Sequence, residues 1–155
     1  MSTDRGKYTK LALSATILGF ISLFMPTSFH VSISSSYFFL VWMWGFVLDY
    51  SSGTLNANLF YYDAFSIPAI VFLLIIFIGT ILLLVFTIKV KKGALKGALG
   101  IIGSLINIGG TILYISVMEI LIPNIWTGYW PCIGVVLPII SGIIGLVAGI
   151  KVSKA

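Results

Sequence analysis

The sequence predicts an all-α membrane protein, a four-transmembrane-helix bundle whose first outer loop is expected to add a small antiparallel β-sheet. Three observations support this class: the composition, the number of long apolar runs and the placement of the basic residues. Of the 155 residues, 59% are hydrophobic and 8% are charged, and the mean hydropathy is +1.16. These values lie far outside the range of soluble domains. We therefore expect one integral membrane domain over residues 1–155, with little chain left for a second.

Four apolar runs are long enough to cross the membrane. A helix needs about 20 apolar residues to span a hydrocarbon core about 30 Å thick. The expected transmembrane helices are residues 11–29, 66–88, 97–118 and 131–150. The segments between them are an outer segment at 30–65, a cytoplasmic loop at 89–96 and an outer loop at 119–130. Because the cytoplasmic loop is short, the second and third helices are expected to be antiparallel neighbours.

The basic residues decide the topology. With four crossings, all nine fall on one side of the membrane: Arg5, Lys7, Lys10, Lys89, Lys91, Lys92, Lys96, Lys151 and Lys154. A fifth crossing at residues 31–48 would divide them three against six. The positive-inside rule therefore favours four crossings, with both termini in the cytoplasm and the protein in the cell membrane.

The same basic residues bear on partners. The lipid bilayer is the main one, and the lysines between the second and third helices are candidates for contact with anionic headgroups, namely Lys89, Lys91, Lys92 and Lys96. Topology alone also explains these lysines. Each lysine near an anionic leaflet is worth about 1 kcal/mol of attraction. Nucleic-acid binding is not expected, because no folded basic surface remains outside the membrane.

The third run carries small residues at alternating spacings of four and three, which places them on one stripe of a helix. The helix-packing residues predicted here and in the fourth run are Gly93, Gly97, Gly100, Gly103, Ser104, Asn107, Gly110, Thr111, Ser141, Gly145 and Gly149. In lipid, small residues let helix backbones approach closely. The third and fourth helices are therefore expected to pack tightly. Asn107, near mid-membrane, is expected to hold helices together more than to contact a substrate or ion.

The outer segment leaves two placements open. Residues 31–36 alternate apolar and polar side chains, and the aromatic stretch 37–50 is too short to cross a membrane. One placement is an antiparallel sheet that turns at residues 51–53 and returns through residues 55–62. The other is an aromatic belt lying in the membrane interface. The sheet is preferred, because β-branched and aromatic residues flank a turn that contains glycine.

Several short motifs resemble those of the claudin-like tetraspan proteins. Residues 26–32, Pro-Thr-Ser-Phe-His-Val-Ser, resemble the start of the claudin first loop, with Phe29 where a tryptophan is expected. Trp44-Gly45-Phe46 resembles the Gly-Leu-Trp motif, and Tyr62-Asp63 ahead of Pro68 resembles the approach to the second helix. The two cysteines that close the claudin loop are absent. The resemblance implies lateral self-assembly, adhesion or a paracellular-type barrier.

Candidate chemical groups are few. The ionisable residues on the outer side, candidates for a cation-attracting mouth, are His30, Asp49, Asp63 and Glu119. Their spacing follows no metal motif, so solvated positions at helix ends are the simpler interpretation. Cys132 is the single cysteine, which excludes an intrachain disulfide and suggests a small apolar filler. We expect no catalytic residue, cofactor or metal, since no acid–base set or ligand cluster lies within the membrane.

Two functional hypotheses follow. The first is a non-enzymatic tetraspan that acts by assembling with copies of itself or as an accessory subunit of a membrane complex. It depends on the small-residue stripes, which are expected to exceed what four short helices can use internally. The alternative is an oligomeric channel or transporter subunit, whose path is lined by Ser104, Asn107 and Thr111 of neighbouring copies.

Overall fold

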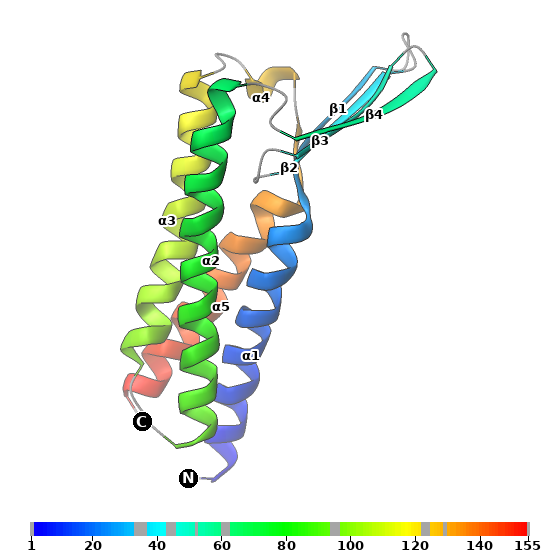
Figure 1. The fold of residues 1–155 in the computed structure, drawn as a ribbon. Coiled ribbons are helices and arrows are strands. Elements are labelled where there is room, and N and C mark those ends of the chain that lie inside the picture. Colours follow the sequence, from blue (N-terminus) through cyan, green and yellow to red (C-terminus); the bar gives the residue numbers. More distant parts are fainter. Residues whose placement is uncertain are drawn as a thin grey trace.

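We describe the fold from a computed structural model of the chain. The described residues are 2–32, 37–42, 46–51, 53–59, 63–93, 97–121, 125–128 and 130–154, without the side chains of 2–5, 63–69 and 125. Four long helices lie side by side, and a sheet projects from one end of them (Figure 1). The two chain ends lie at the opposite end.

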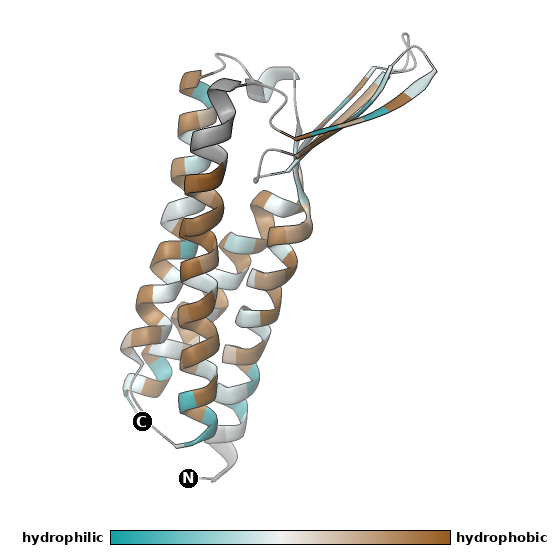
Figure 2. Cartoon of the chain, viewed as in Figure 1, coloured by the Kyte–Doolittle hydropathy of each residue, from teal (hydrophilic) through white to brown (hydrophobic). Residues whose placement is uncertain are grey.

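The long helices are α1 (Ser2–Phe24), α2 (Asp63–Lys91), α3 (Ala98–Leu121) and α5 (Ile133–Ser153). α1 packs against α2 and α5, and α3 packs against the same two helices from the other side. The predicted neighbours, second with third and third with fourth, are thus in contact. Among the described residues, three helices are long and apolar enough to cross a membrane: Ile70–Lys91 within α2, α3 and α5. Hydrophobic residues predominate along them (Figure 2), and exposed ones include Leu74, Leu105 and Ile143.

The helix boundaries differ from the predicted ones where local chemistry intervenes. α1 ends at Phe24 instead of residue 29, because Pro26 begins a strand. Thr27 and Ser28 make the chain more polar here than in the helix, but no charged residue lies between Lys10 and Phe29 to mark the end of the run. α2 continues to Lys91, and the chain then turns at Gly93, whose φ of +94° is accessible to glycine at low cost. Gly93 therefore precedes α3 and does not belong to its helical stripe. Gly97, directly before α3, does pack as predicted, because a Cβ there would overlap the Gly149 carbonyl oxygen of α5.

The outer segment forms the predicted antiparallel sheet. Its strands are β1 (Pro26–Ser32), β2 (Tyr37–Trp42), β3 (Phe46–Ser51) and β4 (Thr54–Leu59). The hairpin between β3 and β4 turns at Gly53, with φ +81°, where the sequence placed it. The first strand begins at Pro26 rather than at residue 31, while 33–36 and 60–62 lie outside the described residues.

The second outer loop also contributes to the sheet, although no pattern in the sequence predicts this pairing. This loop contains the short helix α4 (Ile125–Gly128) and the two-residue strand β5 (Trp130–Pro131). β5 pairs with β1, so the strand order is β4-β3-β2-β1-β5. Two outer segments that are far apart in the sequence therefore share one sheet.

The interior of the helices has three levels. Next to the sheet lies an apolar cluster that includes Phe72, Tyr114 and Val135. At the other end a second apolar cluster includes Phe86 and Val152. Between the two clusters lie buried hydroxyl and amide side chains from all four helices, which we call the polar layer. Its members are Thr16, Thr80, Thr87, Ser104, Asn107, Thr111 and Ser141.

Candidate functional site

The polar layer connects the helices through hydrogen bonds. The Ser141 hydroxyl donates to the Ala15 carbonyl oxygen at 2.7 Å and accepts from the Asn107 amide nitrogen at 3.4 Å. The hydroxyls of Thr16 and Thr87 lie 3.1 Å apart. These contacts join α1 to α5, α3 to α5 and α1 to α2. In an apolar environment such bonds are worth about 0.6 kcal/mol each on average, so the layer fixes how the helices face one another.

Two oxygens of the polar layer are buried without a hydrogen-bond partner among the described residues, Oδ1 of Asn107 and Oγ1 of Thr80. Both side chains are fully buried. The Asn107 oxygen lies against Gly79, where a Cβ would overlap it. An unpartnered buried polar group costs about 1–3 kcal/mol. The layer contains no ionisable side chain, so it offers hydrogen bonding but no acid or base.

The small residues predicted for helix packing are used within one copy. A Cβ at Gly100 would meet the Phe86 ring at 2.6 Å, and one at Gly110 would meet Ile75 at 2.5 Å. On the other side, a Cβ at Gly145 would lie 2.5 Å from the Ser104 hydroxyl. The expectation that these stripes exceed what the helices need was therefore wrong. The two antiparallel neighbours of α3, α2 and α5, occupy both of its sides at once.

The same burial corrects the proposed lining of a channel. Ser104, Asn107 and Thr111 are fully buried between α2, α3 and α5 of one copy. Side chains in that position cannot face a path between neighbouring copies. The sequence could not separate the two cases, because a small polar stripe is typical both of a tight helix contact and of a pore.

The sheet is held on the helices by contacts at its root. The hydroxyl of Thr27, at a bulge in β1, lies 2.9 Å from the Tyr114 hydroxyl of α3 and donates to the Val41 carbonyl oxygen at 3.0 Å. The Cys132 backbone N–H, just before α5, donates to the Thr27 carbonyl oxygen at 2.8 Å. One threonine therefore joins the sheet, α3 and the start of α5. Neither Thr27 nor Tyr114 was singled out by the sequence, since only the bulge brings them together.

The predicted cation mouth is not assembled by the described residues. Asp49 is buried on β3 and accepts hydrogen bonds from Ser51 and Asn56. His30, on β1, donates from Nδ1 to the Gly128 carbonyl oxygen at 2.5 Å. Glu119 lies near the end of α3, and the side chain of Asp63 lies outside the described residues. No group of three or more His, Cys, Asp or Glu side chains that could hold a metal occurs in the described part of the chain.

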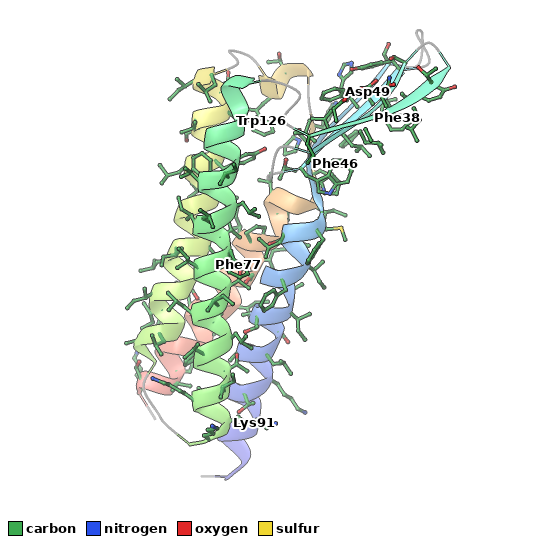
Figure 3. All side chains as sticks on the ribbon, viewed as in Figure 1. Phe38, Phe46, Asp49, Phe77, Lys91 and Trp126 are labelled. Atoms are coloured by element: carbon green, nitrogen blue, oxygen red, sulfur yellow. The ribbon has the colours of Figure 1, made fainter. Side chains whose placement is uncertain are left out.

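The lysines lie at the end of the helices opposite the sheet, where Lys91 is labelled in Figure 3. Lys89, Lys91 and Lys92 are exposed there, and Lys96 lies outside the described residues. Contact with anionic lipid through these residues stays a prediction.

The outer sheet is the remaining candidate site, and its free border is β4. In the described part of the chain β4 has one hydrogen-bonded neighbour, β3. Five of the six β4 residues are exposed, and only Asn58 is half-buried. The exposed fractions of Leu55 and Leu59 are 61% and 62%. Searches against protein-family models and against curated proteins found no match for this chain.

Proposed function

We propose that this protein is a non-enzymatic membrane protein that crosses the bilayer four times and acts by lateral self-assembly through β4. The single observation that carries the proposal is the open edge of the sheet. β4 presents backbone N–H and C=O groups along its outer border, and the sequence Thr-Leu-Asn-Ala-Asn-Leu contains no charge and no proline. Natural proteins usually place charged residues or proline on an edge strand to prevent pairing with another chain. Their absence from β4 favours pairing.

A second copy of this chain is the partner that fits the edge best. A twofold axis perpendicular to the sheet brings two β4 strands together antiparallel and leaves the same face of both sheets on one side. Two copies related in this way share one membrane orientation when the sheets run along its surface. The assembly then forms a continuous sheet over two sets of helices.

The packing of α1 and the placement of the lysines support four crossings. α1 carries Lys7 and Lys10 near its start, which makes it less apolar than the three candidate spans, but it packs against two of them, α2 and α5. All the described lysines of α2 and α5 lie at or beyond the helix ends opposite the sheet. By the positive-inside rule that end is cytoplasmic, and the sheet faces outward at the cell membrane.

The resemblance to claudin-like proteins adds to the proposal of lateral assembly. The resemblance rests on short motifs such as residues 26–32, which form β1. Kinship with that group carries the expectation of adhesion or a barrier between cells in addition to lateral assembly. The other role that depends on contacts with proteins is that of an accessory subunit in a larger membrane complex.

Disulfide cross-linking in native membranes tests the proposal. In a Cys132→Ala background, cysteines introduced at Asn56 and Ala57, near the middle of β4, are expected to give covalent dimers on mild oxidation. In a symmetric antiparallel pair the central residues of the two strands lie close together. Val31→Cys is the matched control, because Val31 is also exposed (55%) but belongs to an inner strand.

A charge on the edge separates pairing from random collision. Adding Asn58→Lys to the Ala57→Cys variant puts a lysine next to the pairing position on each strand and brings two like charges near the axis, so the dimer yield is expected to fall severalfold. Equal dimer yields for Ala57→Cys and Val31→Cys would overturn assembly through β4. An unchanged dimer yield after Asn58→Lys is added would overturn it as well. Native mass spectrometry in mild detergent gives the number of copies independently.

A further inference from the structure

The register of the sheet separates its side chains into two faces of different chemistry. Residues paired directly across antiparallel strands point to the same side, and neighbours along a strand alternate. One face, which we call the apolar face, consists of Phe29, Val31, Phe38, Leu40, Trp42, Phe46, Leu48, Tyr50, Leu55, Ala57, Leu59 and Trp130. The opposite face carries most of the polar side chains, including His30, Asp49 and Asn56. The separation extends across all five strands.

Ring contacts agree with this assignment. Phe38 stacks on Tyr50 with ring centroids 5.8 Å apart, and Trp42 meets Phe46 edge-on at 5.0 Å. Both pairs lie within the apolar face. On the opposite face the His30 ring lies 6.0 Å from that of Tyr37. The apolar face is therefore a continuous surface of aromatic and aliphatic groups that contact one another.

The apolar face is the more exposed of the two faces, which is the reverse of the arrangement that water favours. An antiparallel sheet with one solvated face normally turns its polar side chains outward. Here no residue of the apolar face is buried, and Trp130 is 68% exposed. The opposite face holds the buried residues of the sheet, among them Phe39, Val47 and Asp49. An open apolar surface of this extent indicates a contact with another apolar phase.

The position of the apolar face identifies that phase. The Trp42 indole N–H, which belongs to the apolar face, donates to the Phe24 carbonyl oxygen at the end of α1 at 2.9 Å. Phe24 itself is 71% exposed and continues a row of exposed apolar side chains on α1 that includes Ile17 and Ile21. Figure 3 shows Phe38 and Phe46 beneath the strands, on the side toward α1. The apolar face is thus continuous with the side of the helices that meets lipid.

We propose that the apolar face of the sheet rests on the membrane leaflet nearer to it, with its aromatic rings in the interface between headgroups and acyl chains. Tryptophan and tyrosine concentrate at that depth because their rings have one apolar and one polar end. The opposite face, where His30 bonds to Gly128 of α4, then points away from the membrane. The inference rests on the helices crossing a membrane, and it depends neither on which side is the cytoplasm nor on pairing through β4.

Spin labels on neighbouring residues of β4 test this arrangement. In a Cys132→Ala background, Leu59→Cys places a nitroxide on the apolar face and Asn58→Cys places one on the opposite face, at nearly the same distance from the helices. Leu55→Cys and Asn56→Cys form a second pair, in which both parent residues are exposed. The protein is placed in phosphatidylcholine nanodiscs with one copy per disc. Collision rates are measured with oxygen, which concentrates in lipid, and with a water-soluble nickel chelate.

The labels at residues 59 and 55 are expected to collide severalfold more often with oxygen than with nickel, relative to their partners at 58 and 56. The contrast is expected to be largest at 59, the position nearer the helices. Equal nickel collision rates within both pairs would overturn the inference. Protection of residue 59 from both reagents in discs that hold one copy would also overturn it, because protein and not lipid would then cover the face. Circular dichroism shows whether each labelled variant retains its fold.

Discussion

Two glycines of α3 provide a matched test of the helix contacts. A Cβ at Gly103 would lie 2.8 Å from the Gly79 carbonyl oxygen and 3.0 Å from the Leu82 Cβ, whereas a Cβ at Gly109 would have nothing within 4 Å. Both residues lie inside the same helix. Replacing either by alanine gives the same gain in helix propensity, about 1 kcal/mol. That gain cancels when the two variants are compared, so the comparison isolates packing.

The size of the packing effect follows from the distances. The Gly103→Ala variant must move α3 away from the α2 backbone by about 0.5 Å to restore an ordinary carbon–oxygen contact. A gap of 0.5–1 Å forfeits about a quarter to a half of the dispersion energy of each contact along an interface. Overpacking a close interface costs about 1–3 kcal/mol in total. We therefore expect Gly103→Ala to be less stable than Gly109→Ala by that amount.

Reversible unfolding in mixed micelles, titrated with dodecyl sulfate and followed by circular dichroism, measures both stabilities on one scale. The expected order is Gly109→Ala at or above the parent protein and Gly103→Ala below it. A difference between the two variants smaller than about 0.5 kcal/mol, which is the usual range for substitutions that touch nothing important, would refute the close approach of α2 and α3.

Three further predictions use the same unfolding assay. Thr80→Val, which removes an unpartnered hydroxyl and keeps the shape, is expected to leave stability unchanged or higher, whereas Thr16→Val loses two hydrogen bonds and about 1 kcal/mol; the reverse order would contradict the polar layer as described. Ser141→Ala is expected to cost about 1–2 kcal/mol through its two bonds, and no loss would mean that they contribute nothing. Tyr114→Phe removes the bond to Thr27, so hydrogen exchange of β1 is expected to accelerate, and unchanged exchange would argue against this link.

Hydrophobic run length predicted the apolar spans in α2, α3 and α5, and β-propensity with a glycine turn predicted the hairpin at Gly53. These features are local, so a single sequence can indicate them. The end of α1 was placed too late, because the uncharged run was followed to Phe29 although Pro26 already starts a strand. Run length alone cannot distinguish an apolar strand from the last turn of a helix.

The candidate site was harder to predict because it depends on pairing between distant residues. The small stripe of α3 was recognised, but whether Asn107 faces its own helices or a neighbouring copy depends on how all four helices close around it. The alternation within β2 and β3 is weak because aromatic residues occupy both faces. Only the register between strands showed that Phe38 and Tyr50 share one face while Phe39 and Asp49 share the other.

Because β1 pairs with β5, the sheet can be completed only late in the synthesis of the chain. β1 leaves the ribosome early, whereas its neighbour at Trp130 and Pro131 follows about 100 residues later, at roughly 5–20 residues per second. For that interval one border of β1 is unprotected, and it closes only when the segment leading into the last helix arrives. A chain interrupted before α5 would consequently display a second adhesive strand, and so be a target for chaperones or proteases during membrane insertion.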